Sequence, residues 1–171
     1  PQMQRLAVSL LVLTACGGGS STKTTPEPAK PTVWKDMNLD QRTTYMKEVV
    51  LPKTKEIFVA FDAKYQTMDC VTCHGDGAAD GSFEMPNAKI KPLPNSEEAF
   101  MAWVAKEPEA GRYAQFMSEK LEPLMGELLQ EAVFDPKTKT GELGCTTCHM
   151  LIDPSGNVIK AEHKPGEHDH H

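Results

Sequence analysis

The chain has 171 residues, of which 39% are hydrophobic, 25% charged and only 6% aromatic, a length that suits one domain with tails and excludes two large domains. Eighteen Lys and Arg face 24 Asp and Glu, which gives a net charge of −6, so a nucleic-acid partner, which requires a basic face, is not expected. Five cysteines leave one over after any pairing, and a simple disulfide framework therefore fits the sequence badly.

The first residues are typical of a targeting segment. Residues 6–13 form an apolar run of signal-peptide size, too short to cross a bilayer, which takes roughly 20 apolar residues. The run closes as Leu13-Thr14-Ala15-Cys16 before three glycines, and this resembles the bacterial lipobox. The resemblance implies a signal peptide over residues 1–15 and an exported lipoprotein, lipidated at Cys16 and anchored at the periplasmic face or cell surface. The alternative is a short core element with a buried cysteine.

Low-complexity segments flank the region between residues 36 and 160. Residues 16–35 are rich in Gly, Ser, Thr, Pro and Lys, a composition that buries too little apolar area to fold and is typical of a flexible tether. Residues 161–171 hold four of the six histidines and are expected to be a disordered tail. One domain over residues 36–160 is therefore predicted.

The first helix of that domain is predicted between a cap at Asn38 or Asp40 and about Phe61. It contains the pattern M-x-E-x-x-x-P-x-x-x-E, starting at Met46, and the same pattern recurs from Met117. Both copies place apolar residues in one helical stripe, and this indicates an internal repeat with units of about 40–94 and 113–160. The mid-pattern prolines are expected to kink or split both helices.

Two motifs of the form C-x-x-C-H follow the two helices, at residues 70–74 and 145–149. This is the attachment signature of c-type haem: two thiols bind the porphyrin and the adjacent histidine faces the iron. The alternatives are one zinc ion held by both cysteine pairs, or two local disulfides. Both leave the histidines unexplained, so two covalently bound haem c groups are predicted at the residues Cys70, Cys73, His74, Cys145, Cys148 and His149.

The remaining elements are a loop, a short helix, a longer helix and a turn. Residues 75–94 are rich in Gly, Pro and Asn and predict a loop at a haem edge. Asn95 with Glu98 resembles a capping box for a helix to about Lys106, and the second repeat helix is predicted over about 113–133. A turn is expected at 135–141. Since no strand-like alternation is present, the fold should be mostly α, with two helix–turn–CxxCH units and long irregular loops.

The sixth iron ligands follow by elimination. Apart from His74 and His149 every histidine lies in the C-terminal tail, and methionine is the usual alternative ligand. The repeat favours Met46 and Met117. Met85, on the loop after the first motif, is the alternative for the first haem, and buried core methionines are the alternative reading of both helices.

The pattern resembles the multihaem cytochrome subunit of photosynthetic reaction centres, in which a helix with the axial methionine precedes each CxxCH helix. The resemblance covers roughly residues 40–160. The chain departs from that family in having two units instead of four, and Met-to-Cys intervals of 24 and 28 residues. The tether and the length of the chain also fit a subunit of a larger respiratory or photosynthetic complex.

The function expected from the sequence is electron transfer with redox partner proteins, without catalysis. The alternatives are a dihaem peroxidase or small-molecule reductase with one open haem site, and a haem-based sensor or assembly module. The net charge of −6 favours a partner with a basic docking face.

Overall fold

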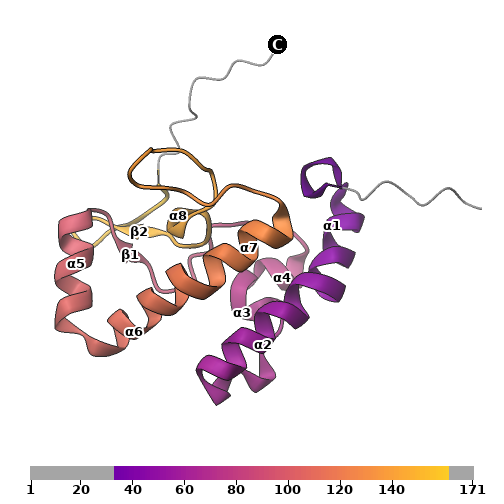
Figure 1. Cartoon of the computed structure of the whole chain (residues 1–171), viewed down its shortest axis with the longest axis horizontal. Coiled ribbons are helices and arrows are strands. Elements are labelled where there is room, and N and C mark those ends of the chain that lie inside the picture. The colour runs from indigo at the N-terminus through magenta and orange to yellow at the C-terminus, as the bar shows by residue number, and fades with distance from the viewer. Residues whose placement is uncertain (1–32, 162–171) are drawn as a thin grey trace, which may run out of the picture. The chain divides into compact units, whose positions relative to one another are not determined.

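The structure, a computed structural model, describes residues 33–161 (Figure 1). Helices dominate this range, so the prediction of a mostly α fold is confirmed. No helix between residues 33 and 161 is both long and apolar enough to cross a membrane. The predicted signal peptide, the lipidation site Cys16, most of the tether and the tail beyond residue 161 lie outside the described residues.

The first long helix begins after a short 3₁₀ turn, η1 (Trp34–Asp36), and consists of α1 (Leu39–Tyr45), a π turn η2 (Met46–Val50) and α2 (Leu51–Phe61). Asn38 caps it: its side chain accepts the Gln41 backbone N–H, and the Gln41 side chain accepts the Asn38 backbone N–H. The expected cap at Asn38 and the expected end at Phe61 are both confirmed.

Proline does not split this helix, so the split, one of the two outcomes expected, does not occur. Proline has no N–H and its ring collides with the carbonyl group four residues earlier. The π turn meets both problems, because the Leu51 N–H reaches back five residues to the Met46 carbonyl and the helix is widened just before Pro52. The helical backbone conformation therefore continues from α1 through η2 into α2.

The second long helix has the same construction: α6 (Pro108–Phe116), the π turn η4 (Met117–Leu121) and α7 (Glu122–Leu129). The Glu122 N–H bonds to the Met117 carbonyl just before Pro123. The predicted limits of 113 and 133 are wrong. Pro108 occupies the first turn, where a missing N–H costs nothing, and the helix ends at Gln130, whose φ is +54°.

Shorter helices make up most of the remainder. They are η3 (Ala63–Thr67), α3 (Cys70–His74), α4 (Gly77–Asp80), α5 (Glu97–Lys106) and α8 (Cys145–Cys148). Both CxxCH motifs thus form single helical turns. The cap predicted for α5 is wrong by one residue, since the Ser96 hydroxyl, not Asn95, accepts the Ala99 N–H.

A small sheet, which the sequence did not predict, joins the two halves of the chain. Its strands β1 (Leu93–Pro94), β2 (Leu151–Ile152) and β3 (Val158–Ile159) lie in that order, β1–β2 parallel and β2–β3 antiparallel. Strands of two residues are too short for an alternating pattern. The sheet ties the segment after the first motif to the segment after the second.

Two apolar clusters form the core. One contains Val50, Leu128, Leu129 and Leu143, and the other Phe58, Met68 and Phe116. Aromatic rings join α2 to α6 in the second cluster: Phe58 meets Phe116 edge-on at 4.9 Å between centroids, and Phe61 stacks on Phe116 at 4.2 Å. The second cluster therefore fixes the end of the first long helix against the middle of the second, at Phe116.

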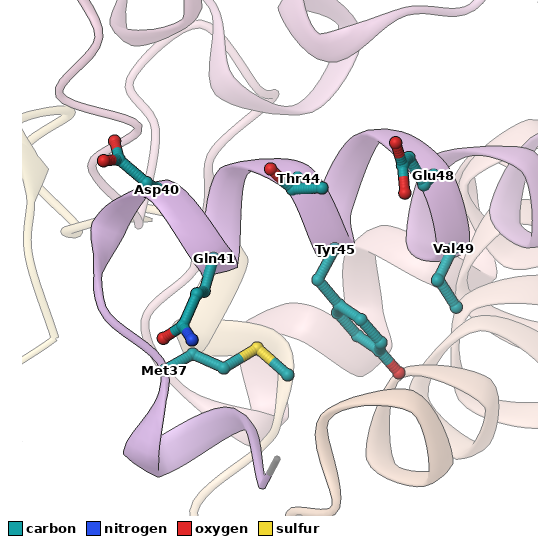
Figure 2. A pocket seen from close by; sticks show the side chains of 7 residues that line it. All are labelled: Met37, Asp40, Gln41, Thr44, Tyr45, Glu48 and Val49. Carbon is teal, nitrogen blue, oxygen red and sulfur yellow. The ribbon is translucent and has the colours of Figure 1, made fainter. Parts of the chain in front are cut away.

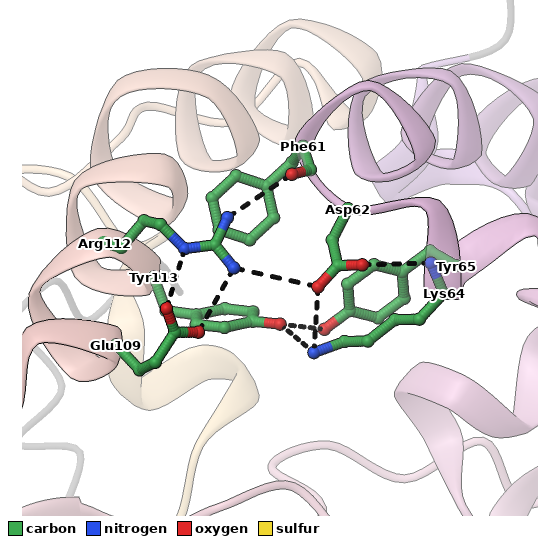
Figure 3. A network of polar contacts seen from close by, with 7 residues as sticks. All are labelled: Phe61, Asp62, Lys64, Tyr65, Glu109, Arg112 and Tyr113. Atoms are coloured by element: carbon green, nitrogen blue, oxygen red, sulfur yellow. Dashed lines mark hydrogen bonds and ion pairs between the residues drawn. The ribbon is translucent and has the colours of Figure 1, made fainter.

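A polar network covers this junction (Figure 3). Arg112 bonds both carboxylate oxygens of Glu109 at 3.2 Å and donates to the Phe61 carbonyl, while its guanidinium lies 4.1 Å from the centre of the Phe61 ring. Tyr65 and Tyr113 share a hydrogen bond between their hydroxyls at 3.2 Å. Burial, together with this bond, raises the pKa of Tyr65 to about 12.

Candidate functional site

The two CxxCH turns are built alike, and the threonine before the second cysteine is the reason. The Thr72 hydroxyl accepts the backbone N–H of Asp69 at 3.1 Å, and the Thr147 hydroxyl accepts that of Gly144 at 3.0 Å. Each bond closes the helix over the residue that precedes the first cysteine. In the first motif the Asp69 carboxylate also accepts the Val71 N–H, at 3.0 Å.

The two motif histidines share one hydrogen-bonding arrangement. Nδ1 of His74 donates to the carbonyl oxygen of Phe83 at 3.2 Å, and Nδ1 of His149 donates to that of Lys91 at 2.9 Å. A carbonyl oxygen only accepts, so the proton lies on Nδ1 and Nε2 carries the free lone pair. This is how proteins usually orient a histidine that binds a metal through Nε2.

Further contacts hold the first histidine in the neutral state that metal binding needs. The Phe83 ring meets the imidazole edge-on, with 5.4 Å between centroids. Burial lowers the pKa of His74, and the hydrogen bond to Phe83 opposes that shift in part. A neutral, fixed imidazole is the form that binds iron.

Asn87 links the two motifs. It is buried, with 9% of its surface exposed. Its side chain donates to the carbonyl of Cys73 at 3.0 Å, and its backbone N–H donates to the carbonyl of Cys148 at 3.2 Å. Its side-chain oxygen accepts the Lys89 N–H at 2.9 Å. The loop after the first motif thus supplies partners to both motifs, a role that sequence reasoning missed.

Gly75 makes this loop possible. Its φ is +53°, a region that favours glycine, and a Cβ there would lie 2.6 Å from Nδ2 of Asn87. No other residue type fits between the first motif and the Asn87 side chain without displacing it.

An apolar cavity of about 390 Å³ lies beside the first motif, within the size range of small-molecule sites. Cys70, Cys73 and His74 line one part of it, and α1, η2 and α2 line another. Cys148 and Thr147 of the second motif also reach it. The apolar side chains of its wall include Val50, Leu51, Phe58, Leu121, Leu129 and Leu143.

The structure brings some predicted residues together and separates others. Met46 and its alternative Met85 both line the cavity with the first motif. Met117 is not among the lining residues; it packs with the Phe58–Met68–Phe116 cluster. His149 also lies outside the lining, and the thiol of the exposed Cys145 donates to a carboxylate oxygen of Glu122 at 3.2 Å. The first motif therefore lies at a formed pocket. The second motif forms a helical turn whose residues Thr147 and Cys148 reach the edge of that same pocket.

A second, more open hollow of about 370 Å³ lies on the outer side of α1 (Figure 2). No residue of either CxxCH motif lines it. Its wall consists of Met37, Asp40, Gln41, Thr44, Tyr45, Glu48 and Val49. The cavity beside the first motif is therefore the candidate site.

The four motif cysteines are free thiols. Burial raises the pKa of Cys73 and of Cys148 to about 11, and burial with the neighbouring Glu122 carboxylate raises that of Cys145 to about 12. Between residues 33 and 161 no three or more His, Cys, Asp or Glu side chains gather as a metal site, so the described residues form no four-ligand zinc centre from the two cysteine pairs.

Comparison of the chain with known protein families, with curated proteins and with solved structures found no match.

The residues of the first motif fit a covalently bound haem. Two thiols and a histidine with a free Nε2 come from one helical turn at the wall of an apolar cavity, and a methionine of a different helix also lines it. The apolar wall suits the porphyrin face, and the thioether sulfur of methionine is a known iron ligand.

Proposed function

We propose that the protein is an electron carrier with two covalently attached haem c groups, one at Cys70, Cys73 and His74 and the other at Cys145, Cys148 and His149. The observation that carries the proposal is the matched orientation of the two histidines, each with Nδ1 held by a loop carbonyl. One zinc ion held by the two cysteine pairs, or a pair of local disulfides, does not use the histidines and gives no reason for this match.

The chain's own residues have defined tasks in such a carrier. Iron in the haem supplies the redox change when the group is bound. Cys70 and Cys73 hold the porphyrin edge through thioether bonds, and His74 presents Nε2 to one face. The apolar wall excludes water and disfavours the more highly charged oxidised iron, which raises the reduction potential.

Met46 is the preferred sixth ligand of the first haem. Met85 lies two residues after Phe83, whose carbonyl accepts the Nδ1–H of His74, so it shares its chain segment with the residue that orients the histidine. Met46 starts the π turn of a separate helix, and π turns are frequent at functional sites.

Replacement of each methionine by alanine tests this choice. Met46→Ala should abolish the Met–Fe charge-transfer band of one haem, and Met85→Ala should leave it. The reverse result would make Met85 the ligand.

Haem attachment tests the proposal directly. The full chain, produced with a c-type haem maturation system, should carry two haems by intact mass and by pyridine haemochrome absorbance. Cys70→Ser/Cys73→Ser and Cys145→Ser/Cys148→Ser should each remove one. A chain that leaves maturation with four free thiols would refute the proposal.

The position of Met117 favours a second candidate function, a peroxidase or small-molecule reductase. Met117 packs with the Phe58–Met68–Phe116 cluster, against which Cys73 of the first motif also packs, and this position favours an open site at the second haem. Binding of carbon monoxide to one of the two reduced haems would support the reductase. Resistance of both haems would support the carrier, and slow electron exchange with a partner cytochrome would indicate a sensor or assembly module.

The setting of the carrier follows from the sequence. The lipobox supports an exported lipoprotein, tethered to a membrane at the periplasmic face or cell surface through Cys16. The tether and the length of the chain support a place in a larger electron-transfer complex. The charge of −6 supports a redox partner with a basic docking face.

A further inference from the structure

Arg42 places a fixed positive charge at the cavity of the first motif. The guanidinium lies 5.0 Å from the centre of the Trp34 ring. It donates from Nε to the Trp34 carbonyl at 3.3 Å and from one terminal nitrogen, Nη2, to the Lys35 carbonyl at 3.2 Å. Arg42 is half-buried and lines the cavity.

This charge has no partner in the described chain. Arg42 forms no ion pair with any residue between 33 and 161, and no hydrogen bond in that range engages its second terminal nitrogen, Nη1. Two carboxylates also line the cavity, Asp69 and Glu131, but that of Asp69 accepts the Val71 N–H at the start of α3. A half-buried guanidinium with free donors at an apolar cavity is suited to an anionic ligand group.

We propose that Arg42 binds a propionate carboxylate of the haem held by Cys70, Cys73 and His74, and thereby raises the reduction potential of that haem. This rests on the proposed function. The propionates lie on the porphyrin edge away from the thioether-forming vinyl groups. In the protein, Arg42 comes from α1 whereas the thiols come from α3, so the two sets of groups occupy different walls.

The helix geometry supports the assignment. Arg42 and Met46 are four residues apart, so both side chains lie on one helical face, about 6 Å apart along the axis. A methionine above the iron therefore places the guanidinium toward the rim of the same porphyrin. An unpaired carboxylate at an apolar wall is costly, and the arginine removes that cost.

The proposal predicts a charge effect on one haem. A unit positive charge about 10 Å from the iron, at an effective dielectric constant of 20, favours the reduced state by roughly tenfold. For a one-electron couple, tenfold corresponds to about 59 mV. Arg42→Gln should lower one midpoint potential by about this amount, and Arg42→Lys by less than half of it.

Arg112→Gln is the matched control. Arg112 also lies over an aromatic ring and donates to a backbone carbonyl, both of Phe61, but it does not line the cavity (Figure 3). In the haem-loaded full chain, spectroelectrochemical titration should find both potentials unchanged in this variant. The potential lowered by Arg42→Gln should belong to the haem that remains after Cys145→Ser/Cys148→Ser.

Three results would overturn the proposal: an unchanged potential in Arg42→Gln, an equal shift in Arg112→Gln, or equal shifts in Arg42→Gln and Arg42→Lys. The last would mean that Arg42 only fixes residues 34–36. If Arg42→Gln does not fold, the resonance Raman propionate band of Arg42→Lys decides: a shifted band supports the contact, and an unshifted band refutes it. A wild-type chain without haem would instead refute the proposed function.

Discussion

Removal of the Asn87 side chain should destabilise the protein far more than loss of an exposed asparagine. Asn87→Ala deletes the bond to the Cys73 carbonyl (3.0 Å) and the bond from the Lys89 N–H (2.9 Å). At about 1 kcal/mol for each, the loss is about 2 kcal/mol. For a domain of this size, that lowers the melting temperature by roughly 8 °C, measurable by far-ultraviolet circular dichroism.

Two further variants sharpen the test. Asn87→Asp keeps the acceptor for Lys89 but sets a carboxylate oxygen against the Cys73 carbonyl, so it should be at least as unstable as Asn87→Ala. Asn157→Ala removes one exposed side-chain bond to Asp153, of 3.0 Å, and should change the melting temperature by less than about 2 °C. If Asn87→Ala melts no lower than Asn157→Ala, the loop does not hold the motifs as argued.

Two other predictions concern stability. The pKa of Tyr65 is raised to about 12 in the folded chain, against about 10 in the unfolded chain. The neutral Tyr65 hydroxyl therefore adds its full share to the free energy of unfolding below pH 10, and this share is lost as the pH rises through 12. Tyr113→Phe should therefore be less stable than wild type at pH 8 by denaturant unfolding, with a gap that narrows above pH 10; a constant gap would contradict this. Gly141→Ala should cost about 2–4 kcal/mol, because φ is +94° and the new Cβ would lie 2.3 Å from the Val133 carbonyl oxygen. Gly156→Ala, with φ of +87° and open space around it, should cost at least 1 kcal/mol less, and equal losses would refute the steric argument.

Features that depend only on residues close together in the chain can be predicted from the sequence. A cap such as Asn38 and the extent of the first helix follow from neighbouring residues, and both agree with the structure. A split at Pro52 and Pro123 was expected because the π turns that accommodate these prolines have no sequence signature: a π turn is a backbone conformation and is not tied to one residue type. The true start of the second helix at Pro108 is hard to predict, because a proline that begins a helix and a proline that breaks one look the same in sequence.

The rest of the site could not be read from the sequence because it depends on main-chain atoms and distant pairs. The acceptors for the motif histidines are the carbonyls of Phe83 and Lys91, and any residue type carries a carbonyl. His149 and Lys91 are 58 positions apart. Asn87 lies in a segment rich in turn-forming residues, and nothing in the sequence distinguishes it from an ordinary turn asparagine. The functional role proposed for Arg42 depends on its position at the cavity, which the sequence does not show.

The parallel pairing of β1 with β2 has a consequence for how the protein is made. During synthesis, residues 70–94 leave the ribosome before residues 145–152. The loop that positions His74 gains its β-sheet partner and the Asn87–Cys148 bond only when the C-terminal half arrives. Until then, the first motif lacks both contacts. In the proposed haem carrier, haem attachment to the first motif would fall within this interval, before the sheet forms.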